Sequence, residues 1–186
     1  MSIHISRRLI SNSLAEIFTS YQLIDLTTFM PLLEAQYASS SDEPALECPA
    51  RWAIVNAVLA LGVRSKTAAG SEAAMSDVVD GFCRNGTAAL PELLLDEPSL
   101  LTVQALLAMV MFAKGIPDVQ AFIVFATNAS RMLQLFSLES EFLGLIMELE
   151  DLEQYGKVCD CLSKFEREAT DLMGQKTVTG TESAMF

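Results

Sequence analysis

Hydrophobic residues are densest near the middle of the chain, where they predict two consecutive helices. From Leu100 to Ala113 nearly every side of a helix is apolar, which is typical of a helix surrounded by protein. Ser99 can cap the start of this helix, and Gly115 suits a left-handed position that would end it. Asp118 can then cap a second helix, so we expect a tight helical hairpin at the centre of the molecule.

The second helix of this hairpin has two different stripes. Its apolar positions recur at steps of three and four, and they are Phe122, Phe125, Ala126, Ala129, Leu133 and Phe136. Its polar positions are Gln120, Thr127, Arg131 and Gln134. We expect the first stripe to pack in the core and the second to meet water or a partner.

Helical spacing also predicts helices before the hairpin. They are a first helix over 6–22, a second capped by Thr28 and ending near Tyr37, a third from Pro49 that residues 66–71 break, and a fourth that carries Met75, Val78, Val79, Phe82, Gly86 and Ala89 toward the core. Residues 38–44 read as a loop, and Pro91 and Pro98 bracket a short link into the hairpin.

After residue 138 the chain becomes acidic, with ten acidic and three basic residues between Glu139 and Leu172. An apolar seam at heptad-like spacing runs through this segment, formed by Tyr155, Val158, Leu162, Phe165, Ala169 and Leu172. We expect a long acidic helix, with the seam serving as part of a monomer's core or, alternatively, as a dimer contact. The Gly/Thr/Ser-rich tail over 174–186 is expected to be disordered.

No stretch alternates apolar and polar residues as a strand would. The prediction is therefore an all-α fold, a single-domain helical bundle over 1–173 with about six to seven helices around the buried central hairpin.

Composition narrows the functional classes. The 186 residues are 51% hydrophobic and 19% charged, which suits one well-buried domain. A net charge of −12 opposes phosphate backbones, so we expect no direct nucleic-acid binding by this chain. Apolar runs reach about fourteen residues, short of the ~20 that a membrane-crossing helix needs, and no signal peptide is recognisable, so we expect no membrane insertion. Four cysteines in apolar or helical context are expected to be free thiols.

Residues that could carry chemistry are few. The single histidine, His4, lies near the N-terminus, so the interior lacks the commonest general base and zinc ligand. Cys159 and Cys161 form a C-x-C pair, but residues two apart on a helix point to nearly opposite sides. A carboxylate run near the start of the acidic helix is expected to be a solvated face, with a divalent-metal site as the alternative; it comprises Glu148, Glu150, Asp151 and Glu153. We expect no catalytic residue, no metal site and no cofactor.

Four residues remain as candidate ligand or partner contacts: Trp52, Gln104, Asn128 and Arg131. Trp52 is expected mainly in the core, with a pocket as the alternative. The three polar residues lie among apolar helices and are expected to hydrogen-bond the backbone between helices or each other; ligand recognition is the alternative.

Three segments carry a family likeness: PARWAIVNAVLALGVR, PSLLTVQALLAMVMFAKG and AFIVFATNASRMLQLFSLE. In this order, after AEIFTSYQLIDLTTFMPLLEAQY, they resemble the N-terminal half of the regulatory, or middle homology, domain of fungal zinc-cluster transcription factors. The positions that match the family pattern are Trp52, Asn56, Ala60, Gly62, Gln104, Ala105, Ala129, Arg131 and Leu138. The likeness spans residues 14–139.

The chain also departs from that family. The family's six-cysteine zinc cluster is absent, and so are its histidine after the L-x-L pattern and its R-R-x-F-W block. The chain therefore looks like a regulatory half-domain without its DNA-binding module. The resemblance implies transcriptional regulation in a fungal nucleus, otherwise the cytoplasm, through inhibitory, ligand-sensing or dimer contacts, with regulation of a secondary-metabolite gene cluster as one role.

The implied partners are another protein, as a homodimer or a full-length zinc-cluster factor, or an apolar small molecule. The rival reading is a small helical enzyme of the cyclase or isomerase type in a biosynthetic pathway, with a pocket between the central helices. Its expected signature is a cavity of about 300 Å³ or more lined by Phe122, Phe125 and Trp52. The sequence favours a non-catalytic role over an enzyme.

Overall fold

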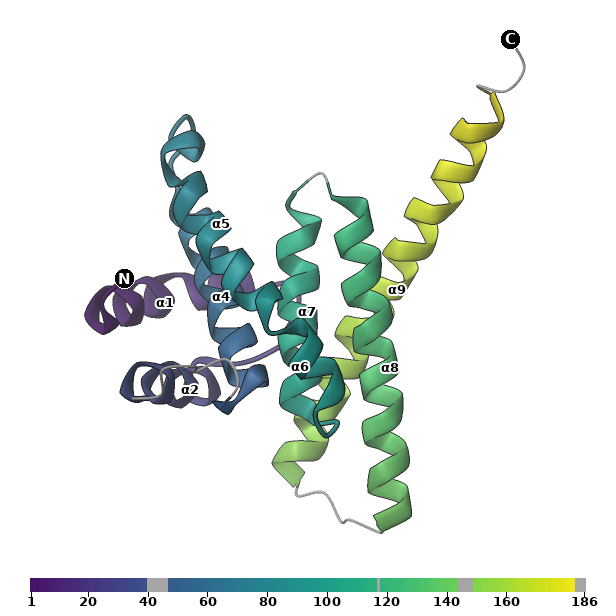
Figure 1. Ribbon diagram of the computed structural model, residues 1–186, viewed down its shortest axis with the longest axis horizontal. Coiled ribbons are helices and arrows are strands. Elements are labelled where there is room, and N and C mark those ends of the chain that lie inside the picture. The colour runs from purple at the N-terminus through teal and green to yellow at the C-terminus, as the bar shows by residue number, and fades with distance from the viewer. Residues whose placement is uncertain (40–46, 117, 144–148, 183–186) are drawn as a thin grey trace.

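The computed structural model describes residues 1–39, 47–116, 118–143 and 149–182, and within these the side chains of 140–143, 149–151 and 173–182 are not described. All secondary structure in these ranges is α-helical and no strand occurs there, so the predicted all-α class is confirmed (Figure 1). The helices are α1 (Ile3–Ile17), α2 (Leu26–Ala38), α4 (Pro49–Lys66), α5 (Glu72–Ala88), α6 (Leu90–Leu95), α7 (Leu100–Lys114), α8 (Val119–Leu143) and α9 (Leu149–Glu182).

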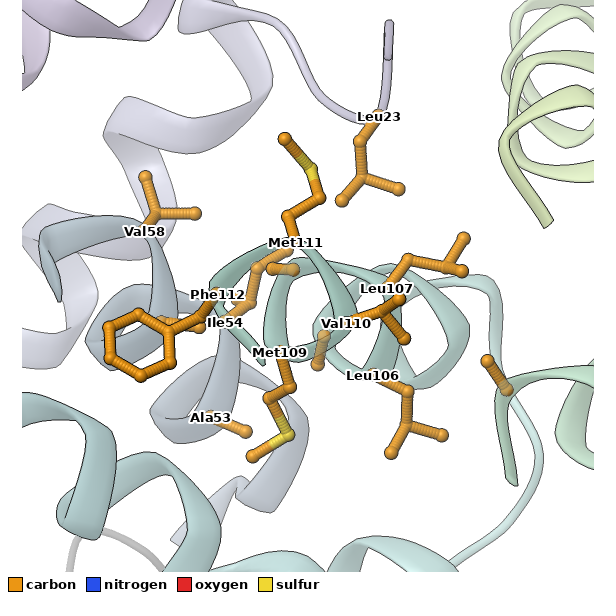
Figure 2. Close-up of a cluster of buried hydrophobic side chains, with 14 of the residues drawn as sticks. Leu23, Ala53, Ile54, Val58, Leu106, Leu107, Met109, Val110, Met111 and Phe112 are labelled. Carbon is orange, nitrogen blue, oxygen red and sulfur yellow. The ribbon is translucent and has the colours of Figure 1, made fainter. Parts of the chain in front are cut away.

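Helix α7 is the central element. It forms an antiparallel hairpin with α8 and also contacts α4, α5 and α9 (Figure 1). Side chains on every side of α7 are buried, from Thr102 to Ala113. Figure 2 shows several of them pointing away from the helix on different sides: Leu106, Leu107, Met109, Val110, Met111 and Phe112. The expected helix sheathed by protein is therefore confirmed.

Local capping explains where the hairpin helices begin. The backbone N–H of Thr102 donates to Ser99 Oγ at 3.1 Å, and that of Ala121 donates to Asp118 Oδ1 at 2.9 Å. Both caps were predicted. The prediction that Gly115 ends α7 in a left-handed conformation is wrong, because its φ is −88° and its ψ is 4°. In the described part of the chain the one glycine with positive φ is Gly70, at 87°.

The boundaries of the earlier helices differ from the predictions. Helix α1 begins and ends a few residues earlier than expected, and the cap of α2 is Asp25, whose Oδ1 accepts the N–H of Thr28 at 2.8 Å. Pro31 therefore lies inside α2, beyond its first turn. The link between Pro91 and Pro98 contains α6, with Pro91 in its first turn. The expected loop over 38–44 lies largely outside the described residues.

The prediction for the first half of α5 is wrong. Met75 and Val78 were expected in the core, yet their exposed fractions are 41% and 44%. Gly86 and Ala89 are buried as expected. The apolar spacing of α5 is helical throughout, but its side chains are half-buried or buried only from Val79 onward, so those of its first two turns stay in solvent.

Helices α8 and α9 complete the bundle. The apolar stripe of α8 is buried or half-buried, and Gln120, Thr127, Arg131 and Gln134 are exposed as predicted. The stretch Val119–Glu139 is long and apolar enough to cross a membrane by length and composition, and 33% of it is buried here; the core helix of a soluble protein meets the same criteria. The seam of α9 packs into the same core, where Val158 and Phe165 are fully buried. This seam is therefore used within the molecule.

Candidate interaction site around Tyr21

The four residues singled out from the sequence lie on three different helices. On α4 the indole Nε1 of Trp52, which is half-buried, donates to the carbonyl of Asn85 at 2.7 Å. On α8 the amide of Asn128 bonds its own helix at Val124, and Arg131 is exposed. The structure thus does not bring these residues into one site. Partner contact by Trp52, Asn128 or Arg131 stays a prediction.

Gln104, on α7, takes part in a long-range contact. Its side chain is buried, and its Nε2 donates to the carbonyl of Leu23 at 2.9 Å. Gln154 of α9 donates to the same carbonyl at 2.6 Å. The segment between α1 and α2 is therefore held by side chains from two helices distant in sequence. Gln104 thus bonds backbone outside its own helix, in the segment between α1 and α2, whereas Asn128 bonds within α8.

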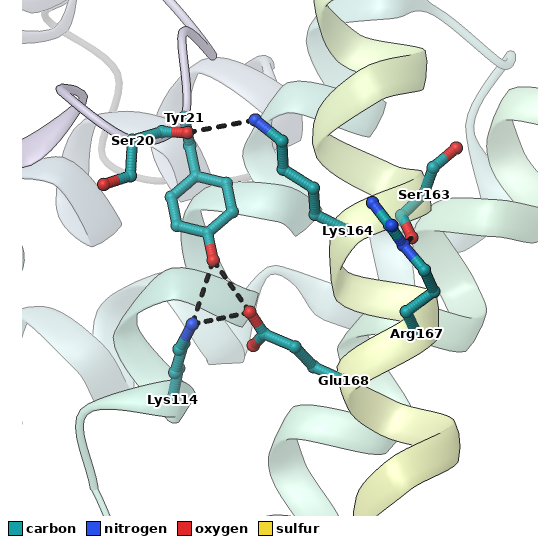
Figure 3. Close-up of polar contacts among 7 residues, drawn as sticks. All are labelled: Ser20, Tyr21, Lys114, Ser163, Lys164, Arg167 and Glu168. Carbon is teal, nitrogen blue, oxygen red and sulfur yellow. Dashed lines mark hydrogen bonds and ion pairs between the residues drawn. The ribbon is translucent and has the colours of Figure 1, made fainter.

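The same segment carries Tyr21, the centre of a polar cluster that we call the Tyr21 clasp: Tyr21, Lys114 and Glu168 (Figure 3). The hydroxyl of Tyr21 donates to Glu168 Oε1 at 3.0 Å. Lys114 Nζ donates to that oxygen at 2.7 Å and to the hydroxyl at 2.9 Å. One residue from the connecting segment, one from the end of α7 and one from α9 thus share three hydrogen bonds.

Aromatic and cationic contacts surround the ring of Tyr21. The ring stacks on Phe165, with 4.4 Å between centroids and 15° between planes. The ammonium groups of Lys114 and Lys164 lie 5.3 and 5.6 Å from the ring centroid, within the range of cation–π attraction. Lys164 also donates to the carbonyl of Ser20 at 3.2 Å. The ring is therefore held by packing as well as by its hydroxyl.

The electrostatics of the clasp favour a structural role. Burial raises the pKa of Tyr21; the hydrogen bond from Lys114 opposes this shift, and Glu168 adds to it. Burial lowers the pKa of Lys114, but its bonds to Glu168 and Tyr21 outweigh that effect, and the pKa is raised overall. A neutral phenol and a charged ammonium therefore persist through neutral pH. Neither group is suited to exchange protons with a substrate there.

A second cation, Arg64 of α4, lies at the C-terminal end of α7. Arg64 of α4 donates from Nη1 to the carbonyl of Phe112 at 2.8 Å and from Nη2 to that of Met111 at 3.3 Å. The carbonyl of Phe112 also accepts the backbone N–H of Gly115 at 3.0 Å. Because the last carbonyls of a helix carry partial negative charge, a guanidinium beside them is favourable. Burial lowers the pKa of Arg64. This arginine caps α7 and places positive charge beside the clasp.

Three surface pockets adjoin the segment between α1 and α2 or the clasp. The α1–α9 pocket, of about 290 Å³, is lined by Ser11, Leu14, Ala15, Phe18, Gln22, Ile24, Asp25, Leu26, Gln154 and Lys157. The α7–α9 pocket, of about 370 Å³, is lined by Ala113, Lys114, Ile116, Asp118, Val119, Phe122, Glu168, Asp171 and Leu172. The Arg64 groove, of about 260 Å³, is lined by Ile17, Ser20, Tyr21, Leu61, Arg64, Ser65, Met111 and Lys114. Lys114 lies between the last two.

Reactive and metal-binding groups are sparse. Among the described residues no three His, Cys, Asp or Glu side chains are grouped to hold a metal ion. Cys161 is buried, and burial raises the pKa of its thiol to about 11, which suppresses the nucleophilic thiolate. Cys159 is half-buried against the core, and His4 is exposed on α1. Of the weighed carboxylates, Glu148 and the side chains of Glu150 and Asp151 lie outside the described residues.

Sequence reasoning missed the Tyr21 clasp. Tyr21 falls within the helix predicted over 6–22, whereas α1 ends at Ile17, and neither Lys114 nor Glu168 was singled out from the sequence. Tyr21 and Glu168 are separated by 147 positions, so no local spacing indicates their contact. The only related signal was the apolar seam of α9, which correctly placed Phe165 in the core.

Comparison with known proteins gives three relatives. A fusaridione A cluster transcription factor of Fusarium heterosporum is 31% identical over 113 residues, which cover 61% of this chain and 21% of that protein. ABC-transporter-regulating transcription factors of Aspergillus oryzae and Aspergillus fumigatus are 29% and 30% identical over 146 and 139 residues. These cover 74% and 70% of this chain but 15% and 14% of the relatives.

No family model and no solved structure matches the chain. The chain spans about a fifth or less of the length of these curated relatives. Across 61–74% of its length, the chain is weakly homologous to fungal transcription factors.

Proposed function

We propose that this chain is a regulatory domain of the kind found in the middle of fungal zinc-cluster transcription factors, and that it acts by contact with another protein. Its relatives are named as a fusaridione A cluster transcription factor and as ABC-transporter-regulating transcription factors, which supports a role in controlling genes of these kinds. On the same basis we assign it to the nucleus.

We favour protein contact over catalysis because side chains fill the space between the central helices. Where α4, α5, α7 and α8 meet, the cavity lined by Phe112, Phe125 and Met109 has a volume of about 10 Å³. That is about the volume available to a single water. Buried polar side chains such as Gln104 and Asn56 bond backbone carbonyls of this chain, so they are committed to the fold. Contacts with other molecules are therefore expected at the surface of the chain.

The enzyme alternative required a cavity lined by Phe122, Phe125 and Trp52. Phe122 does line the α7–α9 pocket, which has the required volume, but Phe125 faces the small closed cavity and Trp52 lines neither. The polar groups nearest Phe122 are carboxylates and the clasp lysine, and Glu168 and Lys114 pair with each other at 2.7 Å. This arrangement supports a docking surface better than a reaction chamber.

Apolar-ligand sensing is a second candidate, and the α1–α9 pocket favours it. Leu14, Phe18 and Ile24 form its apolar wall, and its volume of about 290 Å³ approaches that of small-molecule sites. A ligand bound there would raise the melting temperature of the wild-type chain but not that of a Leu14→Trp variant, in which the larger ring fills the pocket.

The main proposal is tested by tethering. The full chain is fused to a heterologous DNA-binding domain and expressed with a reporter gene in a fungal cell. We expect nuclear fusion protein to change reporter output relative to the DNA-binding domain alone. A Phe165→Asp variant, which places a charge at a fully buried position, should abolish the change, whereas the exposed Asp160→Lys should not. Unchanged reporter output, or an equal change with Phe165→Asp at matched abundance, would contradict the proposal.

A further inference from the structure

The α7–α9 pocket lies between the end of α7, the start of α8 and the part of α9 around Glu168 and Leu172. Its apolar walls come from all three elements: Ala113, Ile116, Val119, Phe122 and Leu172. Apolar surface at the mouth is accessible, since Ile116 is 37% exposed and Val119 and Leu172 are half-buried. The pocket therefore offers an apolar side chain a place to leave water.

Charge at the rim is predominantly negative. Three carboxylates, Asp118, Glu168 and Asp171, line the pocket beside the apolar walls, and among the described residues Lys114 is the one cation that lines it. Lys114 is bound to Glu168 and Tyr21, and one oxygen of Asp118 accepts the N–H of Ala121. Asp171 is exposed, three residues beyond Glu168 on the same helix, so the two carboxylates lie on one face of α9. The rim thus keeps a net negative charge beside an apolar hollow.

We propose that the α7–α9 pocket docks a basic amphipathic helix of a partner protein. One apolar side chain of that helix enters the hollow, and a Lys or Arg one turn away pairs with Asp171 and the outer oxygen of Glu168. This is the helix-in-groove mode of recognition, with affinity from the apolar anchor and orientation from the charges. The inference names the partner chemistry for the protein contact proposed above, and it rests on that proposal.

Other occupants fit the pocket less well. Anionic ligands and nucleic acids would meet three carboxylates and the field of a chain whose net charge is −12. A purely apolar ligand would leave those carboxylates partly desolvated without a compensating charge, which is unfavourable. A basic amphipathic segment satisfies both features at once, and the long-range field speeds its approach.

The test uses a fluorescein-labelled synthetic helical peptide with leucines on one face and arginines beside them, and fluorescence anisotropy with the purified full chain. The comparison peptide has glutamate in place of every arginine. Two protein variants reverse the same charge on α9: Asp171→Lys at the pocket rim, and Asp160→Lys about three helical turns away, outside the pocket lining. Both positions are exposed, so each variant should keep the fold.

We expect saturable binding of the basic peptide, weaker at high salt, and none of the acidic peptide. Asp171→Lys should weaken binding about fivefold, which corresponds to about 1 kcal/mol, because it replaces an attraction by a repulsion. Asp160→Lys should change binding by less than about twofold, since distant exposed charges are screened.

Equal weakening by the two variants would show attraction to overall charge and overturn the inference. Absence of saturable binding to the wild-type chain would do the same. The tethering assay is independent of this peptide, so a regulator that docks elsewhere would still change the reporter while failing here.

Discussion

At Gly115 the guanidinium of Arg64 occupies the space that a side chain would take. A Cβ on Gly115 would lie 2.3–2.4 Å from the central carbon and two nitrogens of that group. The substitution Gly115→Ala must therefore push Arg64 away from the carbonyls of Phe112 and Met111. The backbone conformation at this position is compatible with alanine, because φ is −88° and ψ is 4°.

The net effect is a difference between two opposing contributions. Replacing glycine by alanine in a compatible conformation stabilises a fold by about 0.4–1 kcal/mol. Losing a hydrogen bond from a charged donor costs about 1.5–3 kcal/mol, and losing the cation at a helix C-terminus about 0.3–1 kcal/mol. Because Arg64 is half-exposed, its displaced guanidinium recovers part of this lost free energy through hydrogen bonds to water. We therefore expect Gly115→Ala to lower the free energy of unfolding by about 1 kcal/mol.

The effect of Gly115→Ala on the free energy of unfolding should change sign when Arg64 is replaced. In an Arg64→Met background the obstruction is absent, so Gly115→Ala should stabilise by about 0.4–1 kcal/mol. The coupling energy between the two positions is then about 1.5–2 kcal/mol, far above the additivity expected of independent sites.

Urea unfolding of the four proteins, followed by far-UV circular dichroism, measures this coupling from the midpoints at constant slope. If Gly115→Ala stabilised the wild type as much as it stabilises Arg64→Met, the proposed competition between the methyl group and the guanidinium would be wrong.

Three further outcomes are expected. Phe165→Ala should lower stability by about 3–5 kcal/mol in the same assay, because the ring is fully buried and stacks on Tyr21; a loss below about 1 kcal/mol would mean that α9 is not docked. Gln104→Met should lower the free energy of unfolding by about 1 kcal/mol, because Gln154 still donates to the Leu23 carbonyl. The double variant with Gln154→Ala should lose more than the sum of the two single losses, and additive losses would contradict the shared acceptor. The pKa of Tyr21 is raised above 10.0 in the fold, so the unfolded chain loses this proton first and stability falls as pH rises past that value; alkaline unfolding should be less steep for Tyr21→Phe, and equal profiles would refute this reasoning.

Much of the fold could be predicted because the relevant interactions are local. The caps at Ser99 and Asp118 depend on side chains within three residues of the N–H groups that they accept. Pro49 begins α4 as its sequence position indicates. The uniform apolarity of α7 indicated burial on all sides, since no other arrangement removes it from water.

Predictions that depended on neighbours were less successful. The apolar spacing in α5 placed Met75 and Val78 in the core, but spacing alone does not say which turns another helix will cover. At Gly115 the sequence suggested a left-handed backbone, whereas the structure uses the missing side chain to admit Arg64. In both cases the competing element lies elsewhere in the chain.

The amino-acid sequence by itself determined the helical class, the buried hairpin and the acidic exterior, because periodicity, capping and charge are properties of short segments. Only the tertiary structure decided that Tyr21, Lys114 and Glu168 meet and that an acidic, apolar-walled pocket opens beside them. Their contact depends on how α9 crosses the end of α7, and that crossing is set by the packing of whole helix faces, which no local pattern specifies.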